Sequence, residues 1–105
     1  MTSINKAILI GRVGQEPKVI NESFATFSLA TTEKWKDKET GEKKESTEWH
    51  NIIASKGFLK LIEYIHKGDL LYIEGKIKTR DNNGQKVTDI SVSVDGQIVI
   101  LESKK

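Results

Sequence analysis

The segment that decides the fold is GFLKLIEYIHK, residues 57–67 of this 105-residue sequence. Its apolar side chains recur at the i, i+3, i+4 and i+7 positions of one helix face, at Phe58, Leu61, Ile62 and Ile65. The segments on either side have the shorter period of strands. We therefore expect one amphipathic helix, ended by a glycine turn at Lys67-Gly68-Asp69, whose apolar stripe caps one end of a sheet core.

Two strand patterns lie upstream of this helix. Residues 4–13 are a nearly continuous apolar run that ends at Gly14, which predicts a long buried strand. From residue 24 to Trp35 apolar and small polar residues alternate, which predicts a half-buried strand with Ala25, Phe27 and Leu29 on one face. We assign three larger aromatic residues to the core: Phe24, Phe27 and Tyr64.

The remaining segments complete a sheet. Residues 36–46 contain no apolar side chain, so we expect a mobile, protruding loop that leads into a third strand at residues 47–54. After the helix, residues 71–78 alternate again, with Gly75 marking a bend or bulge. The sequence Asp81-Asn82-Asn83-Gly84 predicts a hairpin, followed by a fifth strand at 88–94 and a short last strand at 98–101.

This order of elements indicates an all-β protein. A helix between the third and fourth of five strands is the order of the OB-fold, a partly open Greek-key barrel. An SH3-like barrel and a small α+β sheet are the alternatives. The length fits one domain. We assign residues 1–102 to a single OB domain and residues 103–105 to a short basic end without an acidic tail.

The composition excludes several classes of protein. With 36% hydrophobic and 30% charged residues it is typical of a soluble globular domain. No apolar run approaches the roughly 18 residues of a membrane helix, and the first residues have no signal-peptide pattern, so we expect a cytoplasmic protein. The absence of cysteine excludes disulfides and thiolate metal sites.

Few residues offer catalytic chemistry. The two histidines, His50 and His66, have no metal-binding spacing, and Gly11-Arg12-Val13-Gly14 is not a phosphate-binding glycine motif. The carboxylates are scattered among lysines, as on a solvated surface. We expect no enzyme activity, no metal and no cofactor.

Base stacking has better candidates. Non-specific single-strand binders combine a basic groove with aromatic platforms, and each stacked base contributes about 1–3 kcal/mol. Trp35 stands between Lys34 and Lys36 where a strand enters the charged loop, and Trp49 points away from Ile52 in the third strand. The alternatives are that Trp49 belongs to the core and that Trp35 folds back over an apolar rim.

Basic residues gather in the centre of the chain. The net charge is only +2, but residues 56–80 hold six Lys or Arg against three acids. Such an excess is either ordinary solvated surface or a track for phosphates. The candidate phosphate contacts are Lys6, Arg12, Lys34, Lys36, Lys56, Lys67, Lys76, Lys78 and Arg80.

Three segments together resemble one family, the bacterial-type single-stranded DNA-binding proteins. They are residues 5–14, residues 47–53 with the sequence Thr47-Glu48-Trp49-His50, and residues 71–80, and the resemblance extends over roughly 4–101. It implies sequence-independent binding of single-stranded DNA by a nucleoid-associated homotetramer, with a dimer as the alternative, in replication, recombination and repair, without a metal or nucleotide. It also implies that Trp35 and Trp49 stack on bases and that His50 lies at a subunit interface, where Tyr72 is a further candidate.

The sequence departs from that pattern at three places. Many members have a stacking phenylalanine where this chain has Ser55, and a tryptophan just after the Thr-Arg pair, where it has Asp81 and Asn82. Losing two stacks predicts weaker binding per site. Members usually continue into an acidic tip that recruits replication and repair enzymes, whereas this sequence ends at Lys104-Lys105. Either such a tail has been removed from the sequence, or the protein is a short variant that does not recruit partners by that route.

Two other functions remain open from the sequence. One is a primosome-type accessory protein of the same fold, which binds single strands together with a helicase or another partner. The presence of both tryptophans argues against it. The other is an OB-fold protein-interaction module without affinity for nucleic acid, which would show no oligonucleotide binding.

Overall fold

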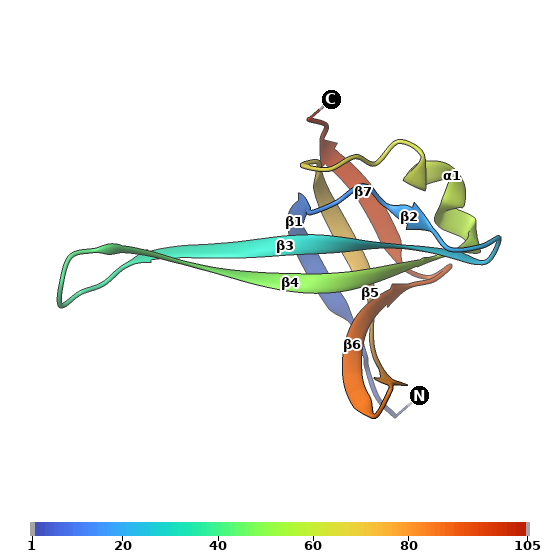
Figure 1. Ribbon diagram of the computed structural model, residues 1–105, viewed down its shortest axis with the longest axis horizontal. Helices are drawn as coiled ribbons and strands as arrows, with labels where there is room; N and C mark the ends of the chain where they lie inside the picture. The colour runs from blue at the N-terminus through green and yellow to red at the C-terminus, as the bar shows by residue number, and fades with distance from the viewer. Residues whose placement is uncertain (1, 105) are drawn as a thin grey trace.

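Five strands close into a barrel in this computed structural model, which describes residues 2–104 (Figure 1). Neighbouring strands follow the order β1-β3-β4-β6-β5, and β5 returns to pair with β1. All of these pairings are antiparallel except β4 with β6. The barrel strands are β1 (Ala7–Val13), β3 (Phe24–Lys36), β4 (Lys43–Ser55), β5 (Leu70–Asn82) and β6 (Gln85–Val92). The predicted OB-fold is therefore confirmed.

Two shorter strands extend this barrel. β7 (Gln97–Glu102) pairs with β5 and is the short last strand that the sequence predicted. β2 (Lys18–Val19) pairs with the start of β3 and was not predicted, because two exposed residues carry no periodic signal. β6 ends earlier than expected, since Val94 lies beyond it and is almost fully exposed.

The helix is much shorter than predicted. The segment forms a 3-10 turn, η1 (Lys56–Phe58), followed by one turn of α-helix, α1 (Leu59–Ile62). Beyond it the chain continues in tighter turns, in which the Ile65 N–H bonds to the Ile62 carbonyl, three residues back. Those turns end where the buried Asp69 carboxylate accepts a hydrogen bond from the His66 backbone N–H at 2.9 Å.

β1 is buried on one face only, not on both as its apolar run predicted. It begins at Ala7, and its inward-facing Leu9 and Val13 meet the core. Ile8 and Ile10 point outward and are 56% and 54% exposed. An apolar residue on the outer face needs another surface to cover it, so this pattern bears on assembly.

A long two-stranded arm replaces the loop expected at residues 36–46. β3 and β4 stay paired far beyond the barrel, out to Lys36 opposite Lys43, as Figure 1 shows. Only residues 37–42 form the turn, which Asp37 closes by accepting backbone hydrogen bonds from Glu39 and Thr40. A ribbon with both faces in water needs no apolar residue, so the polar composition was compatible with strands.

The β5–β6 hairpin forms where the sequence placed it. Asn83 and Gly84 both have positive φ angles, 54° and 85°, as a two-residue type I′ turn requires. In β5, a Cβ on Gly75 would lie 2.7 Å from the Ser91 carbonyl oxygen, so only glycine lets the two strands pass at this point.

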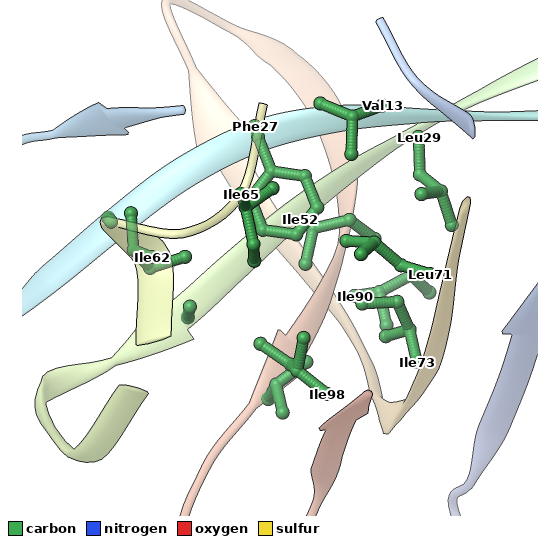
Figure 2. Close-up of a cluster of buried hydrophobic side chains, with 13 residues drawn as sticks. Val13, Phe27, Leu29, Ile52, Ile62, Ile65, Leu71, Ile73, Ile90 and Ile98 are labelled. Atoms are coloured by element: carbon green, nitrogen blue, oxygen red, sulfur yellow. The ribbon is translucent and has the colours of Figure 1, made fainter. Parts of the chain in front are cut away.

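The core fills the barrel and is closed at one end by α1 and the turns after it (Figure 2). Phe27 belongs to it as predicted, but Phe24 and Tyr64 do not. Tyr64 is 67% exposed because the chain has left the helix before it. Phe24 is half-buried, and its side chain lies on the outer face of β3 with that of Thr26, opposite the face of Ala25 and Phe27.

Candidate nucleic-acid interface

Trp49 stands on the outer face of the barrel and is 62% exposed. It lies opposite Ala30 in the β3–β4 register, on the face that points away from the core. A Cβ on Gly14 would collide with two carbons of its ring, so the indole rests on the backbone of the β1–β2 turn. The ring is thus supported from one side and open to solvent on the other, which excludes Trp49 as a core residue.

Trp35 stands on the arm and is 49% exposed. It pairs with Lys44, and because side chains alternate along a strand it points to the other face of the ribbon from Trp49. A hollow of about 410 Å³ surrounds it, lined otherwise by Lys34, Lys36, Lys43, Lys44 and Glu45. The ring therefore does not fold back over the barrel, and four of the residues that line the hollow around it are lysines.

A groove runs along the outer face beside Trp49. It consists of two adjoining hollows of about 320 Å³ and about 550 Å³, which share Thr26, Ile53, Arg80 and Asp89. We call these two hollows the outer groove. The smaller one adds Gln15, Glu16, Lys18, Phe27, Ser28 and Asn51, and the larger one adds Ile20, Phe24, Lys78, Thr79 and Ser91. Strands β3, β4, β5 and β6 all contribute, so this groove crosses the sheet.

Arg80 is fixed at the wall of the outer groove. Its Nε donates to Asp89 Oδ2 at 2.7 Å, and the Asp89 side chain is only 6% exposed. The other carboxylate oxygen, Oδ1, has no hydrogen-bond partner among residues 2–104. A buried carboxylate needs a compensating cation, so Asp89 holds the guanidinium in place while half of the Arg80 side chain stays exposed.

Lys78 also lines this groove, whereas the other predicted phosphate contacts lie outside it. Lys6 pairs with Glu74 at 3.6 Å, and Lys76 pairs with Asp95 at 3.2 Å. A hydrogen bond from the Ser93 hydroxyl, and then that from Lys76, lower the pKa of the Asp95 carboxyl. Both lysines line a separate hollow near the N-terminal segment.

At the far end of β1, Arg12 is turned toward the last strand. Its Nη1 donates to the Gly68 carbonyl at 3.2 Å and to Glu102 Oε1 at 2.6 Å. The hydrogen bond from Arg12 to Glu102 lowers the pKa of the Glu102 carboxyl. Lys67 is exposed beside Glu16, and Lys56 is exposed at the start of η1. The structure therefore brings Lys78 and Arg80 into the outer groove and Lys34 and Lys36 around Trp35.

The sequence matches the single-strand binding protein family over residues 4–101. The chain belongs to this family. Single-stranded DNA-binding proteins of Rickettsia felis and Rickettsia typhi are 43% and 42% identical to it, over 97% of this chain and 75% of theirs. A solved structure titled "Plasmodium falciparum SSB complex with ssDNA" superposes with a TM-score of 0.84 at 39% identity, covering 97% of this chain and 98% of that one.

Membership in the single-strand binding protein family confirms the resemblance that the sequence motifs predicted. No helix within residues 2–104 is long and apolar enough to cross a membrane. Over the same residues, no group of three or more His, Cys, Asp or Glu side chains has the arrangement of a metal site.

The two residues predicted at a subunit interface lie on different surfaces of this family member. His50 is half-buried on the inward side of β4, with its Nε2 2.8 Å from the Thr31 hydroxyl. Tyr72 stands on the outer face of β5, opposite Ile10 on one side and Val99 on the other. Its hydroxyl donates to Glu74 at 3.3 Å, and desolvation, together with that carboxylate, raises the pKa of Tyr72.

Phe24 and Asp89 line the outer groove although the sequence did not predict either of them there. Phe24 was assigned to the core, although the alternation of β3 places it with Thr26 and Ser28 on the outer face. That signal was present in the pattern and was outweighed by the size of the aromatic side chain. Asp89 had no signal, because only the β5–β6 register brings it beside Lys78 and within reach of Arg80.

Proposed function

We propose that this protein coats single-stranded DNA without regard to sequence and protects it during replication, recombination and repair. We place it in the cytoplasm, associated with the DNA. The observation that carries the proposal is the pair of exposed tryptophans, Trp49 at 62% and Trp35 at 49%, on one continuous β3–β4 ribbon. A large apolar ring that the fold leaves in water is a platform for a base. The role is binding rather than catalysis.

Phosphate contacts accompany each of these rings. Lys34 and Lys36 flank Trp35, while Lys78 and Arg80 line the outer groove that leads to Trp49. Lysine and arginine contacts to the backbone carry no base information, and stacking accepts any base, so this combination favours binding without sequence preference. Trp49 lies beside the outer groove and Trp35 on the other face of the ribbon, so a strand that meets both platforms has to pass around an edge of the arm.

We propose further that the protein works as a homo-oligomer, a tetramer as in the family pattern. Ile10, Tyr72 and Val99 form an apolar row across the outer faces of β1, β5 and β7, and Ile8 extends it along the same face of β1, giving four apolar residues. Three of them are exposed by 43% to 56% in the single chain. A row of this kind on a sheet face is suited to packing against the same row of another copy.

Binding assays with three labelled oligonucleotides of one length test the DNA proposal. Fluorescence anisotropy is followed for oligo-dT, a mixed-sequence single strand and the mixed-sequence duplex. The proposal predicts similar affinity for the two single strands, much weaker binding of the duplex, and loss of affinity with salt. Equal affinity for single strand and duplex, or no binding at low salt, would refute it, and the latter would favour a protein-interaction module.

A further inference from the structure

Phe24 occupies a position on the outer face where it can act as an additional stacking platform. It is the first residue of β3 and lies directly opposite Ser55, the last residue of β4. Its side chain is half-buried and is not part of the barrel core. On the same face of β4, Ile53 lies beside it and Trp49 lies further along the strand.

The ring lines the more apolar part of the outer groove. Ile20, Phe24 and Ile53 line this hollow, whose volume of about 550 Å³ is in the range of small-molecule sites. The β2–β3 turn fixes the backbone of Phe24, because the Ile20 N–H donates a hydrogen bond to the Phe24 carbonyl at 3.1 Å. The hollow is therefore preformed and large enough for a flat aromatic ligand.

The walls of this hollow carry positive charge. Lys78 and Arg80 both line it, and Asp89 holds the Arg80 guanidinium in place. An apolar wall beside two cationic side chains suits a ligand that has an aromatic ring and an attached anion. A nucleotide, with its base and its phosphate, is such a ligand. The hollow is also continuous with the smaller one, which reaches Ser28 and Asn51 next to Trp49.

We propose that Phe24 stacks on a base of the bound single strand and supplies an aromatic platform that Ser55 lacks. Residues opposite each other in an antiparallel pair have Cβ atoms about 4.5–5.5 Å apart. Phe24 therefore places an aromatic ring one strand away from the position of Ser55, on the same outer face of the sheet. Phe24 and Trp49 are then separated by six residue steps along the ribbon, about 20 Å at 3.3 Å per residue. This inference rests on the proposed binding of single-stranded DNA.

Substitution of Phe24 tests this assignment by affinity. Phe24→Ala is expected to weaken oligo-dT binding by about 5- to 150-fold, the equivalent of one lost stack, with the salt dependence unchanged. Phe24→Tyr keeps the ring and is expected to bind like the parent protein. Tyr64→Ala serves as the matched control, because Tyr64 is an exposed aromatic residue outside the groove.

A fluorescence probe tests the contact itself. Phe24→Trp is made in a Trp35→Phe, Trp49→Phe background, so that its emission is the only tryptophan signal, and labelled oligo-dT reports binding independently by anisotropy. Quenching that saturates together with the anisotropy supports the proposal. Binding without quenching, or parent-like affinity of Phe24→Ala, overturns it while leaving the proposed function intact. No binding by the unsubstituted protein would instead refute the proposed function.

Discussion

Replacement of Trp49 by alanine separates a binding role from a structural one. The indole is 62% exposed, so about 38% of its surface is covered in the fold. For a side chain of roughly 250 Å² that is about 95 Å², and at about 25 cal/mol per Å² the lost burial costs at most about 2.4 kcal/mol. Domains are stable by about 5–15 kcal/mol, so Trp49→Ala should stay folded.

The same substitution should weaken DNA binding more clearly than it affects folding. One lost stack corresponds to about 1–3 kcal/mol, or about 5- to 150-fold in the dissociation constant for oligo-dT. Because indole carries no charge, the slope of log affinity against log salt should not change. Affinity is measured by anisotropy at several salt concentrations, and stability by thermal melting followed by circular dichroism.

Two results would refute this reasoning. One is a Trp49→Ala protein that unfolds, which would mean that the ring's contact with Gly14 holds the barrel together. The other is a folded variant with unchanged affinity, which would remove Trp49 from the interface. Tyr64 is a similarly exposed aromatic residue, so Tyr64→Ala is the control that should change neither quantity appreciably.

Three further predictions concern the groove, the support of Trp49 and the assembly. Lys78→Ala should reduce the slope of log affinity against log salt by about 0.7, the contribution of one phosphate contact, whereas Lys6→Ala, whose ammonium pairs with Glu74, should not change the slope. Gly14→Ala places a Cβ 3.0 Å from a second carbon of the Trp49 ring, so it should shift the tryptophan emission and weaken oligo-dT binding. Ile10→Asp puts a charge into the exposed apolar row of β1, and light scattering should report a smaller particle than the parent oligomer. An unchanged slope, an unchanged spectrum or an unchanged mass, respectively, would contradict these expectations.

Local pattern was sufficient for the barrel strands. The alternation around Ala25, Phe27 and Leu29 placed β3 with its core face correctly, and Asn83-Gly84 marked the turn between β5 and β6. Both signals are local, because alternation and turn chemistry are set by neighbouring residues. The order of these elements then led to the OB-fold.

Tertiary context decided the features that the pattern missed. The helical spacing of residues 57–67 continued past Ile62, but the buried Asp69 carboxylate binds the His66 N–H and the chain turns tightly before it. The arm needs no apolar residue, because its strands pair with each other alone. Amino-acid composition does not show whether two polar segments pair as strands, so residues 36–46 were predicted as a loop.

The sequence predicted which aromatic residues are exposed at the candidate site, but not how the charged residues are grouped around them. Both tryptophans were identified from their flanking residues, and both are exposed. The grouping of Lys78 and Arg80 with Asp89, and the pairing of Arg12 with Glu102, depend on the strand register and on contacts between ends of the chain. Such contacts join residues far apart in sequence, which leaves no local signal.

A titration of intrinsic tryptophan fluorescence with oligo-dT, at low and at high salt, tests the central claim most directly. Trp35 and Trp49 are the sources of the signal, since the chain contains two tryptophans. If bases stack on them, emission should be strongly quenched at low salt, and the titration should shift to higher DNA concentration as salt is added. Absence of quenching, whether or not the strand binds, would contradict the account.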